Sequence, residues 1–274
     1  GGRPMALWTT DLKDGVLVAT YNNPPMNYFC AEGVAELAGL IATWDSPEIR
    51  VIVITGAVEG RFITHYSVEE LVDLANDQAA MQRMGTALND GYHALLLSLR
   101  HLPVPVIMAM NGDAQGGGFE FSLMGDIRVL QKGDHRVGLP EIKLGIMPGG
   151  SGTQFLPRLI GMGQAINFIV RGQTVPPEDA LSLGLVHELA DNALARAKEI
   201  AAELAQQPRH GMAMAKRAVL RGADLPLTDG LRTEAEAFLS TMLDEDALHA
   251  MKTYLDQPLE ARRDWLSKGG LASG

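Results

Sequence analysis

One stretch of the chain, residues 104–124, constrains the fold more than any other. It begins with a continuous apolar run, residues 104–110, which is typical of a buried strand, and a short turn follows. Gly116, Gly117 and Gly118 then lead into a segment that favours a helix. Glycines at a helix entrance let a ligand approach the backbone, and the first amides of a helix have no partner within it. The sequence therefore predicts a strand that leads to main-chain donors open to a ligand.

Two glutamates lie near glycine-rich segments of the sequence, at residues 116–118 and 149–153. Glu120 lies three residues after Gly117, so both positions share one face of the predicted helix. Glu141 precedes a second glycine-rich segment, residues 149–153, which predicts another helix start. Two carboxylates in an apolar cleft can have separated pKa values, so one can act as a base and the other as an acid. Together with an amide donor, the two carboxylates suit a thioester substrate that reacts through an enolate. In the alternative interpretation both glutamates are structural: Glu120 caps or pairs on its helix and Glu141 ends a strand.

Composition and motifs exclude several classes of function. The formal charge is −10 and no basic stripe is present, which disfavours a nucleic-acid partner. No apolar run approaches the roughly 20 residues that cross a bilayer, and residues 1–4, before Met5, are not typical of a signal peptide. Cys30 is the only cysteine, and the scattered histidines form no H-E-x-x-H pair, so we expect neither disulfides nor a metal site. We therefore expect a cytoplasmic protein with no membrane or nucleic-acid partner.

The predicted elements change in kind at about residue 190. Before it, apolar runs and alternation predict strands at residues 7–13, 16–21, 51–55, 104–110, 126–130, 136–139 and 184–187. Asp14-Gly15 between the first two predicts a hairpin. Helical spacing predicts long helices at residues 31–44 and 81–100. After it, we expect only helices, at residues 192–206, 209–222, 228–243, 245–256 and 258–267. Residues 1–190 are thus predicted to form an α/β core that holds the candidate site, and residues 191–274 a helical region.

Two longer motifs carry a resemblance to a known family. Residues 109–120 read AMNGDAQGGGFE, and residues 139–154 read LPEIKLGIMPGGSGTQ. Shorter matches occur at residues 22–27, 51–56 and 180–186. Together these segments resemble the enoyl-CoA hydratase/isomerase (crotonase) superfamily over nearly the whole chain. The resemblance implies an α/β, crotonase-like (ClpP/crotonase) spiral of ββα units with a C-terminal all-α trimerisation region, and commonly a trimer or a dimer of trimers.

The same resemblance implies an activity and assigns residues to it. It implies an enoyl-CoA hydratase of fatty acid metabolism that acts on an acyl-CoA thioester, with coenzyme A as part of the substrate and no separate cofactor. The oxyanion-hole amides map onto Tyr66 and Gly117. Glu120 and Glu141 map onto the acids that hold the water adding to C3 and supply the proton reaching C2. The implied substrate-binding residues are Met26, Thr64, His65, Tyr66, Gly116, Gly117 and Gly149.

The chain departs from the family in one loop, residues 62–68. The family usually reads Phe-x-Ala-Gly-Ala/Gly-Asp-Leu, where this chain reads FITHYSV. His65 replaces a customary glycine and Tyr66 adds a large ring, although any residue except proline keeps an amide donor. Tyr66 could shape the acyl pocket or react, and His65 could titrate or remain a solvated loop residue. An isomerase, a decarboxylase, an acyl-CoA hydrolase and a non-catalytic acyl-CoA-binding homologue therefore remain alternatives.

The segment after this loop predicts a helix start. Ser67 is a favoured N-cap residue, and Glu70 follows it by three positions. This spacing is that of a capping box, in which each side chain bonds to the backbone amide of the other residue. We therefore expect the loop to end at Ser67.

Overall fold

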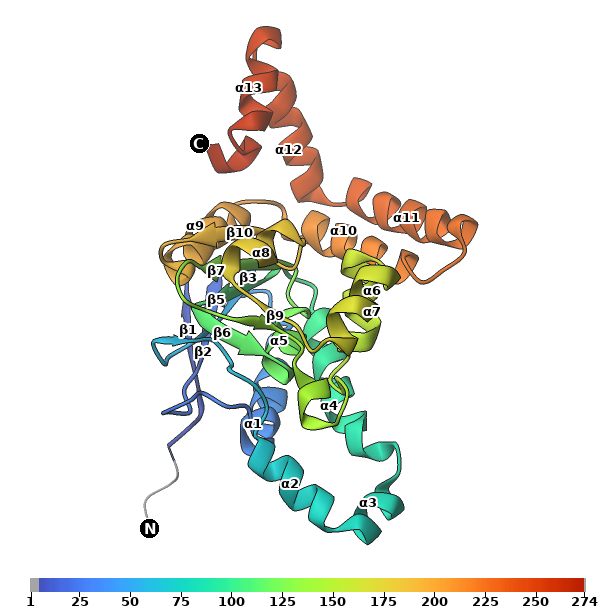
Figure 1. Cartoon of the computed structure of the whole chain (residues 1–274). Helices are drawn as coiled ribbons and strands as arrows, with labels where there is room; N and C mark the ends of the chain where they lie inside the picture. Colours follow the sequence, from blue (N-terminus) through green and yellow to red (C-terminus); the bar gives the residue numbers. More distant parts are fainter. Residues whose placement is uncertain (1–4, 274) are drawn as a thin grey trace.

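A computed structural model describes residues 5–273, so residues 1–4 and Gly274 lie outside the described part. Its core is a six-stranded sheet with the order β1-β2-β3-β5-β7-β10 (Figure 1). The predicted hairpin is confirmed: β1 (Trp8–Lys13) pairs antiparallel with β2 (Val16–Tyr21). The remaining pairs are parallel and join β2 to β3 (Val51–Gly56), β5 (Val106–Met110), β7 (Ile127–Gln131) and β10 (Glu188–Ala190).

A second, four-stranded sheet has the order β4-β6-β8-β9. Its strands are β4 (Gly60–Arg61), β6 (Gly112–Gln115), β8 (Val137–Gly138) and β9 (Thr174–Val175). The successive pairs β3/β4, β5/β6 and β7/β8 each give one strand to each sheet, and helical residues follow each pair. This arrangement confirms the expected spiral of ββα units.

Helices cover both faces of the six-stranded sheet. Helix α9 (Ala193–Ala205) places a row of buried alanines against one face, where Val53 and Ile107 lie. On the other face lies the larger core, which includes Ile52 and Ile54. Cover on both faces explains why residues 51–55 are apolar without alternation. The other helices of the body are α1 (Ala31–Ile41), α2 (Val68–Asn76), α3 (Gln78–Met84), α4 (Ala87–Arg100), α5 (Gly117–Ser122), η1 (Glu141–Leu144), α6 (Gly152–Ile160), α7 (Met162–Val170) and α8 (Pro177–Ser182).

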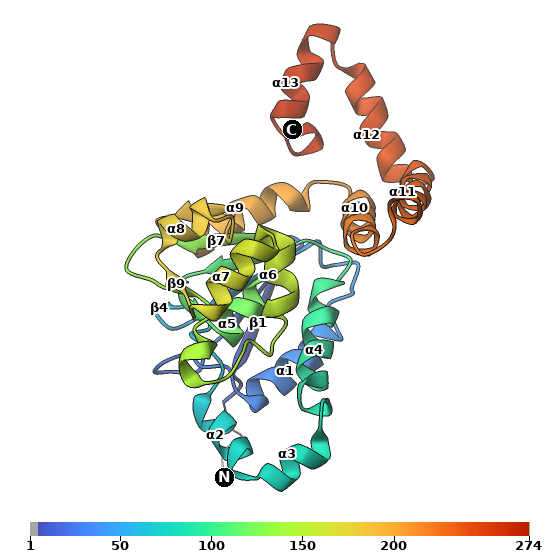
Figure 2. The ribbon, with the colours of Figure 1, turned by 45° about the vertical axis from the view of Figure 1, so that its right-hand side comes forward.

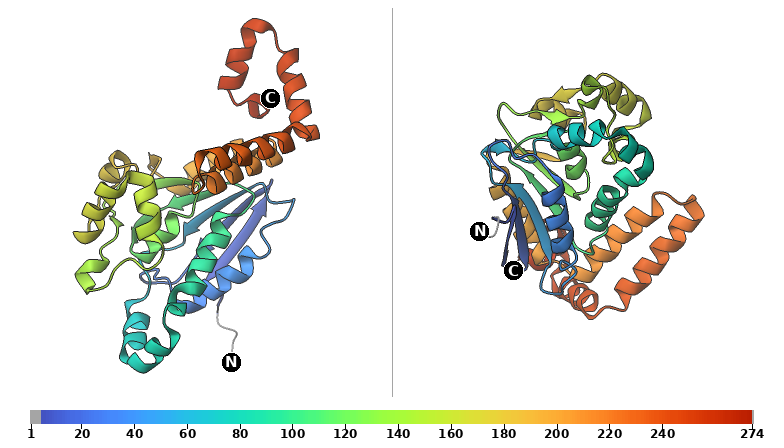
Figure 3. Two further views of the ribbon diagram at one scale, coloured as in Figure 1. Left: turned by 90° about the vertical axis from the view of Figure 1, so that its right-hand side faces the viewer. Right: turned by 90° about the horizontal axis from the view of Figure 1, so that it is seen from below.

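The chain after α9 is helical, as predicted, and extends away from the sheets (Figures 1 and 3). Its elements are α10 (Arg209–Gly222), α11 (Leu227–Met242), α12 (Glu245–Asp256), η2 (Leu259–Ala261), α13 (Arg262–Ser267) and η3 (Gly270–Ser273). Many apolar side chains of this region are exposed, among them Leu227, Phe238, Leu243, Leu255 and Leu259. Within residues 5–273 no helix combines the length and the apolar character that crossing a membrane requires.

Three sequence predictions are wrong in detail. The helix expected at residues 81–100 is divided between α3 and α4, because Gly85 adopts a positive φ of 55°. The helix expected at residues 31–44 ends at Ile41. Residues 184–187 form a turn and a loop, and β10 begins only at Glu188. Burial of an apolar run outside a strand produced the last error, since Leu185 and Val186 are buried in that loop.

Side-chain bonds from Asn111 and a close backbone contact at Gly118 fix the loop that precedes the candidate site. The Asn111 side chain accepts from the Gly56 amide at 3.1 Å and donates to the Arg61 carbonyl at 3.0 Å, which joins β5 to the β3–β4 connection. Helix α5 then packs directly on the backbone of residue 63. A Cβ on Gly118 would lie only 1.8 Å from the carbonyl oxygen of Ile63, so glycine alone fits there.

This close approach predicts the effect of one added methyl group. Gly118→Ala should lower the free energy of unfolding by about 1–3 kcal/mol or more, because the contact is with backbone that cannot rotate away. Gly39→Ala is the matched control: Gly39 lies inside α1 with open space around its Cβ position. This change should be neutral or stabilise by about 0.5–1 kcal/mol through helix propensity. Urea unfolding at matched protein concentration measures both, and equal effects would contradict the packing assigned to Gly118.

Candidate active site

Five of the residues expected at the site lie around one cavity of about 740 Å³. They are Tyr66, Gly117, Glu120, Glu141 and Gly149, and they come from the 62–66 loop, α5, η1 and the turn before α6. Residues of α1, α2 and α4 and of the segment 146–150 line the rest of the cavity. Helices α1 and α4 lie side by side in the body (Figure 2). The fold therefore joins segments that are far apart in the sequence.

The amides of Tyr66 and Gly117 lie close together at the cavity. The loop pairs with Phe29 as in a parallel sheet: the Phe29 amide donates to the His65 carbonyl, and the Ser67 amide donates to the Phe29 carbonyl. Because amides alternate in direction along such a segment, the Tyr66 amide points away from Phe29. A Cβ on Gly117 would lie 3.6 Å from the Tyr66 nitrogen. Within the described part of the chain neither amide donates a hydrogen bond, so both are open to an acceptor.

Gly116 gives α5 its direction at this point. It precedes the helix with φ 52° and ψ −127°, a conformation that favours glycine. Its amide donates to the Gly138 carbonyl at 2.9 Å, which anchors the helix start to β8. Gly117 therefore begins the helix with its amide beside the loop.

Glu120 is buried, with 2% of its surface exposed. One carboxylate oxygen, Oε2, accepts from the Gly152 amide at 2.6 Å. Burial raises the pKa of Glu120 to about 7, against the opposing effect of the Gly152 and Gly150 amides and of the nearby His93. The two amides stabilise the carboxylate, so the structure favours Glu120 in its ionised form more than burial alone would.

Glu141 lies on the cavity wall without such donors. It is 9% exposed, and neither of its carboxylate oxygens has a hydrogen-bond partner among the described residues. Its Oε1 is 3.4 Å from the Cβ position of Gly116, so the carboxyl group lies beside the start of α5. Burial, together with the charge of Glu120, raises the pKa of Glu141 to about 8. Both pKa values are thus raised, and the main-chain donors at Glu120 favour its ionised form in a way that Glu141 lacks.

The two unusual side chains of the loop are held by neighbours. The Tyr66 hydroxyl donates to Glu70 Oε2 at 2.6 Å, and burial followed by this bond raises the pKa of Tyr66. The His65 ring stacks on Tyr28 at 4.2 Å between centroids, and its Nδ1 lies 2.7 Å from the Tyr66 carbonyl oxygen. Tyr66 lines the cavity and His65 does not. These contacts favour the interpretation that Tyr66 shapes the pocket, and they offer no support for a reaction through His65.

The predicted capping box is only half formed. Ser67 Oγ accepts from the Glu70 amide at 3.3 Å, as expected for an N-cap. The Glu70 carboxylate does not return to Ser67 but accepts from the Ala31 amide at 3.0 Å and from Tyr66. Glu70 thus joins the start of α1 to the ring beside the cavity.

Besides His65, three expected substrate-binding residues do not line the cavity. Thr64 is 4% exposed, and its hydroxyl donates to the Met26 carbonyl. Its own carbonyl accepts from the Gln115 amide at 2.8 Å. Met26, Thr64 and Gly116 are absent from the cavity lining and hold the loop and the start of α5 in place. Their part in substrate binding stays a prediction.

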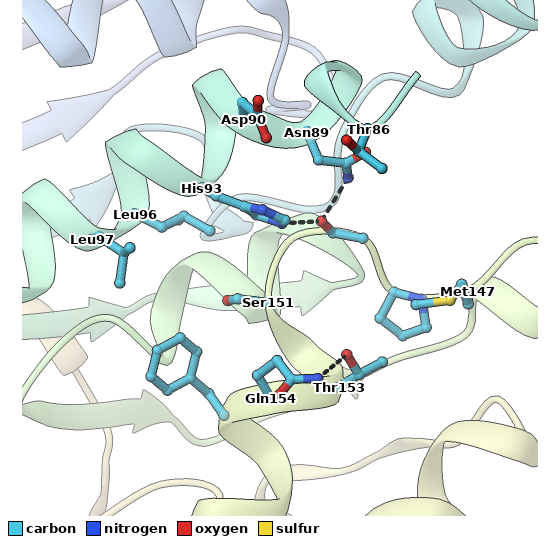
Figure 4. Close-up of a pocket in the computed structure, with 13 residues that line it drawn as sticks. Thr86, Asn89, Asp90, His93, Leu96, Leu97, Met147, Ser151, Thr153 and Gln154 are labelled. Atoms are coloured by element: carbon cyan, nitrogen blue, oxygen red, sulfur yellow. Dashed lines mark hydrogen bonds between the residues drawn. The ribbon is translucent and has the colours of Figure 1, made fainter. Parts of the chain in front are cut away.

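Sequence reasoning missed the contribution of α4. The Tyr92 hydroxyl donates to the Gly117 carbonyl at 3.2 Å. Asn89 and His93 both contact the Gly149 carbonyl oxygen, as Figure 4 shows. The spacing of these three residues in the sequence predicts that their side chains share one helix face. The spacing does not predict which loop that face contacts. In the described part of the chain no group of three or more His, Cys, Asp or Glu residues is placed to hold a metal ion.

Known proteins match this chain along most of its length. A family model described as enoyl-CoA hydratase/isomerase matches residues 11–263. The short-chain-enoyl-CoA hydratase of Clostridium acetobutylicum is 32% identical over 250 residues, which cover 89% of this chain and 93% of that protein. Crystal structures of enoyl-CoA hydratases from Bacillus anthracis and Thermoplasma volcanium, each 27% identical, give TM-scores of 0.84 and 0.82, covering 91% and 90% of this chain and 96% and 97% of theirs. With its spiral fold and paired glutamates, the chain belongs to the enoyl-CoA hydratase/isomerase family.

Proposed function

We propose that this protein is an enoyl-CoA hydratase that adds water syn across the 2,3 double bond of a 2-enoyl-CoA thioester. One observation carries the proposal: two buried carboxyl groups with different pKa values line the same cavity as two open main-chain amides. A hydration needs a base for the water, an acid for C2 and a stabilised oxyanion, and these groups supply all three. The relatives described above are hydratases, which supports the same reaction.

In the proposed reaction the thioester oxygen accepts hydrogen bonds from the Tyr66 and Gly117 amides. The Glu120 carboxylate takes a proton from water as the water oxygen bonds to C3. The π electrons of the double bond move toward the thioester, and the amides stabilise the resulting enolate oxygen. Glu141 gives its proton to C2, which completes a 3-hydroxyacyl thioester. The proton now on Glu120 must return to Glu141, directly or through solvent, before the next turnover.

The unequal pKa values predict a bell-shaped dependence of kcat/KM on pH. Below about 7, Glu120 gains a proton and the base is lost; above about 8, Glu141 loses its proton and the acid is lost. Activity on a short 2-enoyl-CoA should therefore be greatest between these values. The two limbs belong to the coupled pair, since the charge of Glu120 raises the pKa of Glu141. Initial rates across pH 5–10, a range chosen to span roughly two units beyond each limb, measure the profile.

Substitution of each acid assigns the two limbs. In the pH profile of kcat/KM, Glu120→Gln should remove the low-pH limb and Glu141→Gln the high-pH limb. Each variant should also lose about 10²–10⁴ in kcat. In Glu120→Gln the pKa of Glu141 should fall, because a neighbouring charge is gone. Near-wild-type turnover in both variants would remove the proposed mechanism. The exposed Glu69→Gln, on the first turn of α2, is a matched control that should keep the wild-type profile.

We further propose that the acyl chain lies between α1 and α4. The cavity continues there past small side chains: Ala31, Ala35, Ala38, Gly91, Ala94 and Ser98. Ala94→Leu should lower kcat/KM for a ten-carbon enoyl thioester by about 10-fold or more while sparing the four-carbon one, since each methylene in a pocket contributes a factor of about 10–200. Ala87→Leu, exposed on the same helix and outside the cavity lining, is the control. Equal effects on both chain lengths would contradict this placement.

The exposed apolar side chains of α11 and α12 support a further proposal, that the chain forms a homotrimer or a dimer of trimers. Leucines and Phe238 of these helices remain in solvent in the single chain, and such surfaces mark protein–protein contacts. Light scattering coupled to gel filtration should give a mass of three or six chains. Phe238→Glu should shift the mass toward a single chain, while Glu236→Gln, two positions before it on α11, should not. A single-chain mass for the unaltered protein would contradict the proposal.

A further inference from the structure

The peptide that joins Gly149 to Gly150 is held from the side of α4. The Gly149 carbonyl oxygen accepts from Asn89 Nδ2 at 2.8 Å and from His93 Nε2 at 2.7 Å (Figure 4). Asn89 and His93 lie four positions apart and therefore project from the same face of α4. A carbonyl oxygen can only accept, so His93 carries a proton on Nε2 in this contact.

The same peptide faces Glu120 on its other side. A trans peptide is planar, so the carbonyl of Gly149 and the amide of Gly150 point in opposite directions. When α4 holds the carbonyl, the amide is directed away from α4 and toward the Glu120 carboxylate. A Cβ on Gly150 would lie 2.8 Å from Glu120 Oε1, which shows how close the two groups are. The Gly150 amide accordingly contributes to lowering the pKa of Glu120.

The turn itself cannot hold this orientation. Three of its four residues, at positions 149–152, are glycine, and glycine populates several backbone regions with similar ease. Ser151, the fourth, has a φ of 84°, which non-glycine residues rarely adopt. An amide in such a segment keeps one direction only when a rigid element restrains it, and α4 supplies two donors for that purpose.

We propose that Asn89 and His93 are positioning residues for Glu120: by holding the Gly149 carbonyl, they direct the Gly150 amide at the carboxylate that acts as the base. The inference rests on the proposed function for the role of Glu120 as a base. The contact itself stands on geometry and is measurable without turnover. Neither residue needs to touch the substrate for this role.

The effect of the Gly150 amide on Glu120 must be distinguished from the effects of other charged and titratable groups nearby. Glu141 faces it from η1, and Tyr92 faces it from α4. His93 acts on it through its charge, and Asp90 lines the same cavity as His93. A Glu141→Gln background leaves Glu120 as the only titrating carboxyl of the pair.

The direct test follows the Glu120 carboxyl carbon by ¹³C NMR against pH in this background, assigned by its loss in Glu120→Gln. The double variant Asn89→Leu, His93→Leu should raise the titration midpoint by about one to two pH units, because the carboxylate loses a directed donor. His93→Gln keeps a donor near the Nε2 position but removes the histidine charge that lowers the pKa of Glu120, so it should raise the midpoint by clearly less than the double variant does. Asp90→Asn, which removes a charge from the same helix, should leave the midpoint near the parent value.

The titration midpoints of these variants decide whether Asn89 and His93 position the Gly150 amide. A midpoint that does not move in the double variant overturns the positioning role, and a shift in His93→Gln as large as in His93→Leu assigns the effect to histidine charge instead. If the double variant does not fold, the single Asn89→Leu and His93→Leu variants must each raise the midpoint by a smaller amount. In the presence of Glu141, kcat should fall about ten-fold with KM unchanged. A wild-type protein that hydrates no 2-enoyl thioester would refute the proposed function, while the NMR shift would still test the positioning role.

Discussion

The site depends on one close contact between two stretches of backbone. Helix α5 meets the carbonyl of Ile63 at Gly118, with no room for a side chain between them. This contact brings the amides of Tyr66 and Gly117 to the same point, although 51 positions separate them in the chain. Asn111 secures the approach by bonding to Gly56 at the end of β3 and to Arg61 at the end of β4. The unusual loop sequence leaves this arrangement intact, because the contact involves main-chain atoms.

The carboxyl pair shows how one cavity gives two acids different surroundings. Both are buried, so desolvation raises both pKa values. The difference comes from hydrogen bonding: Glu120 receives main-chain donors at the start of α6, and Glu141 has none among the described residues. The ionised Glu120 then disfavours a second charge on Glu141. Backbone geometry therefore gives the two carboxyl groups different surroundings, and the proposed roles of base and acid rest on that difference.

The sequence predicted those features that depend on local spacing or on long motifs. The hairpin, the continuous apolar strands and the helical C-terminal region follow from periodicity, and the relation of Gly117 to Glu120 follows from helix geometry. Contacts between distant segments were not predictable: Asn89 and His93 reach a carbonyl 60 and 56 positions away. The partner of Glu70 was also missed, because its local bond to Ser67 competes with tertiary partners that only the fold supplies. The assignment of Glu141 came from the family motif, since nothing in its immediate spacing places it beside Glu120.

The bond between Tyr66 and Glu70 has a consequence for selectivity. The aromatic ring forms part of the cavity wall, and its outer end is attached to a carboxylate that also bonds to the start of α1. A ring fixed at both ends cannot swing aside when a bulky ligand arrives. Contacts within the chain therefore set the shape of that part of the wall before any ligand enters. The width available beside the open amides is thus determined when the chain folds.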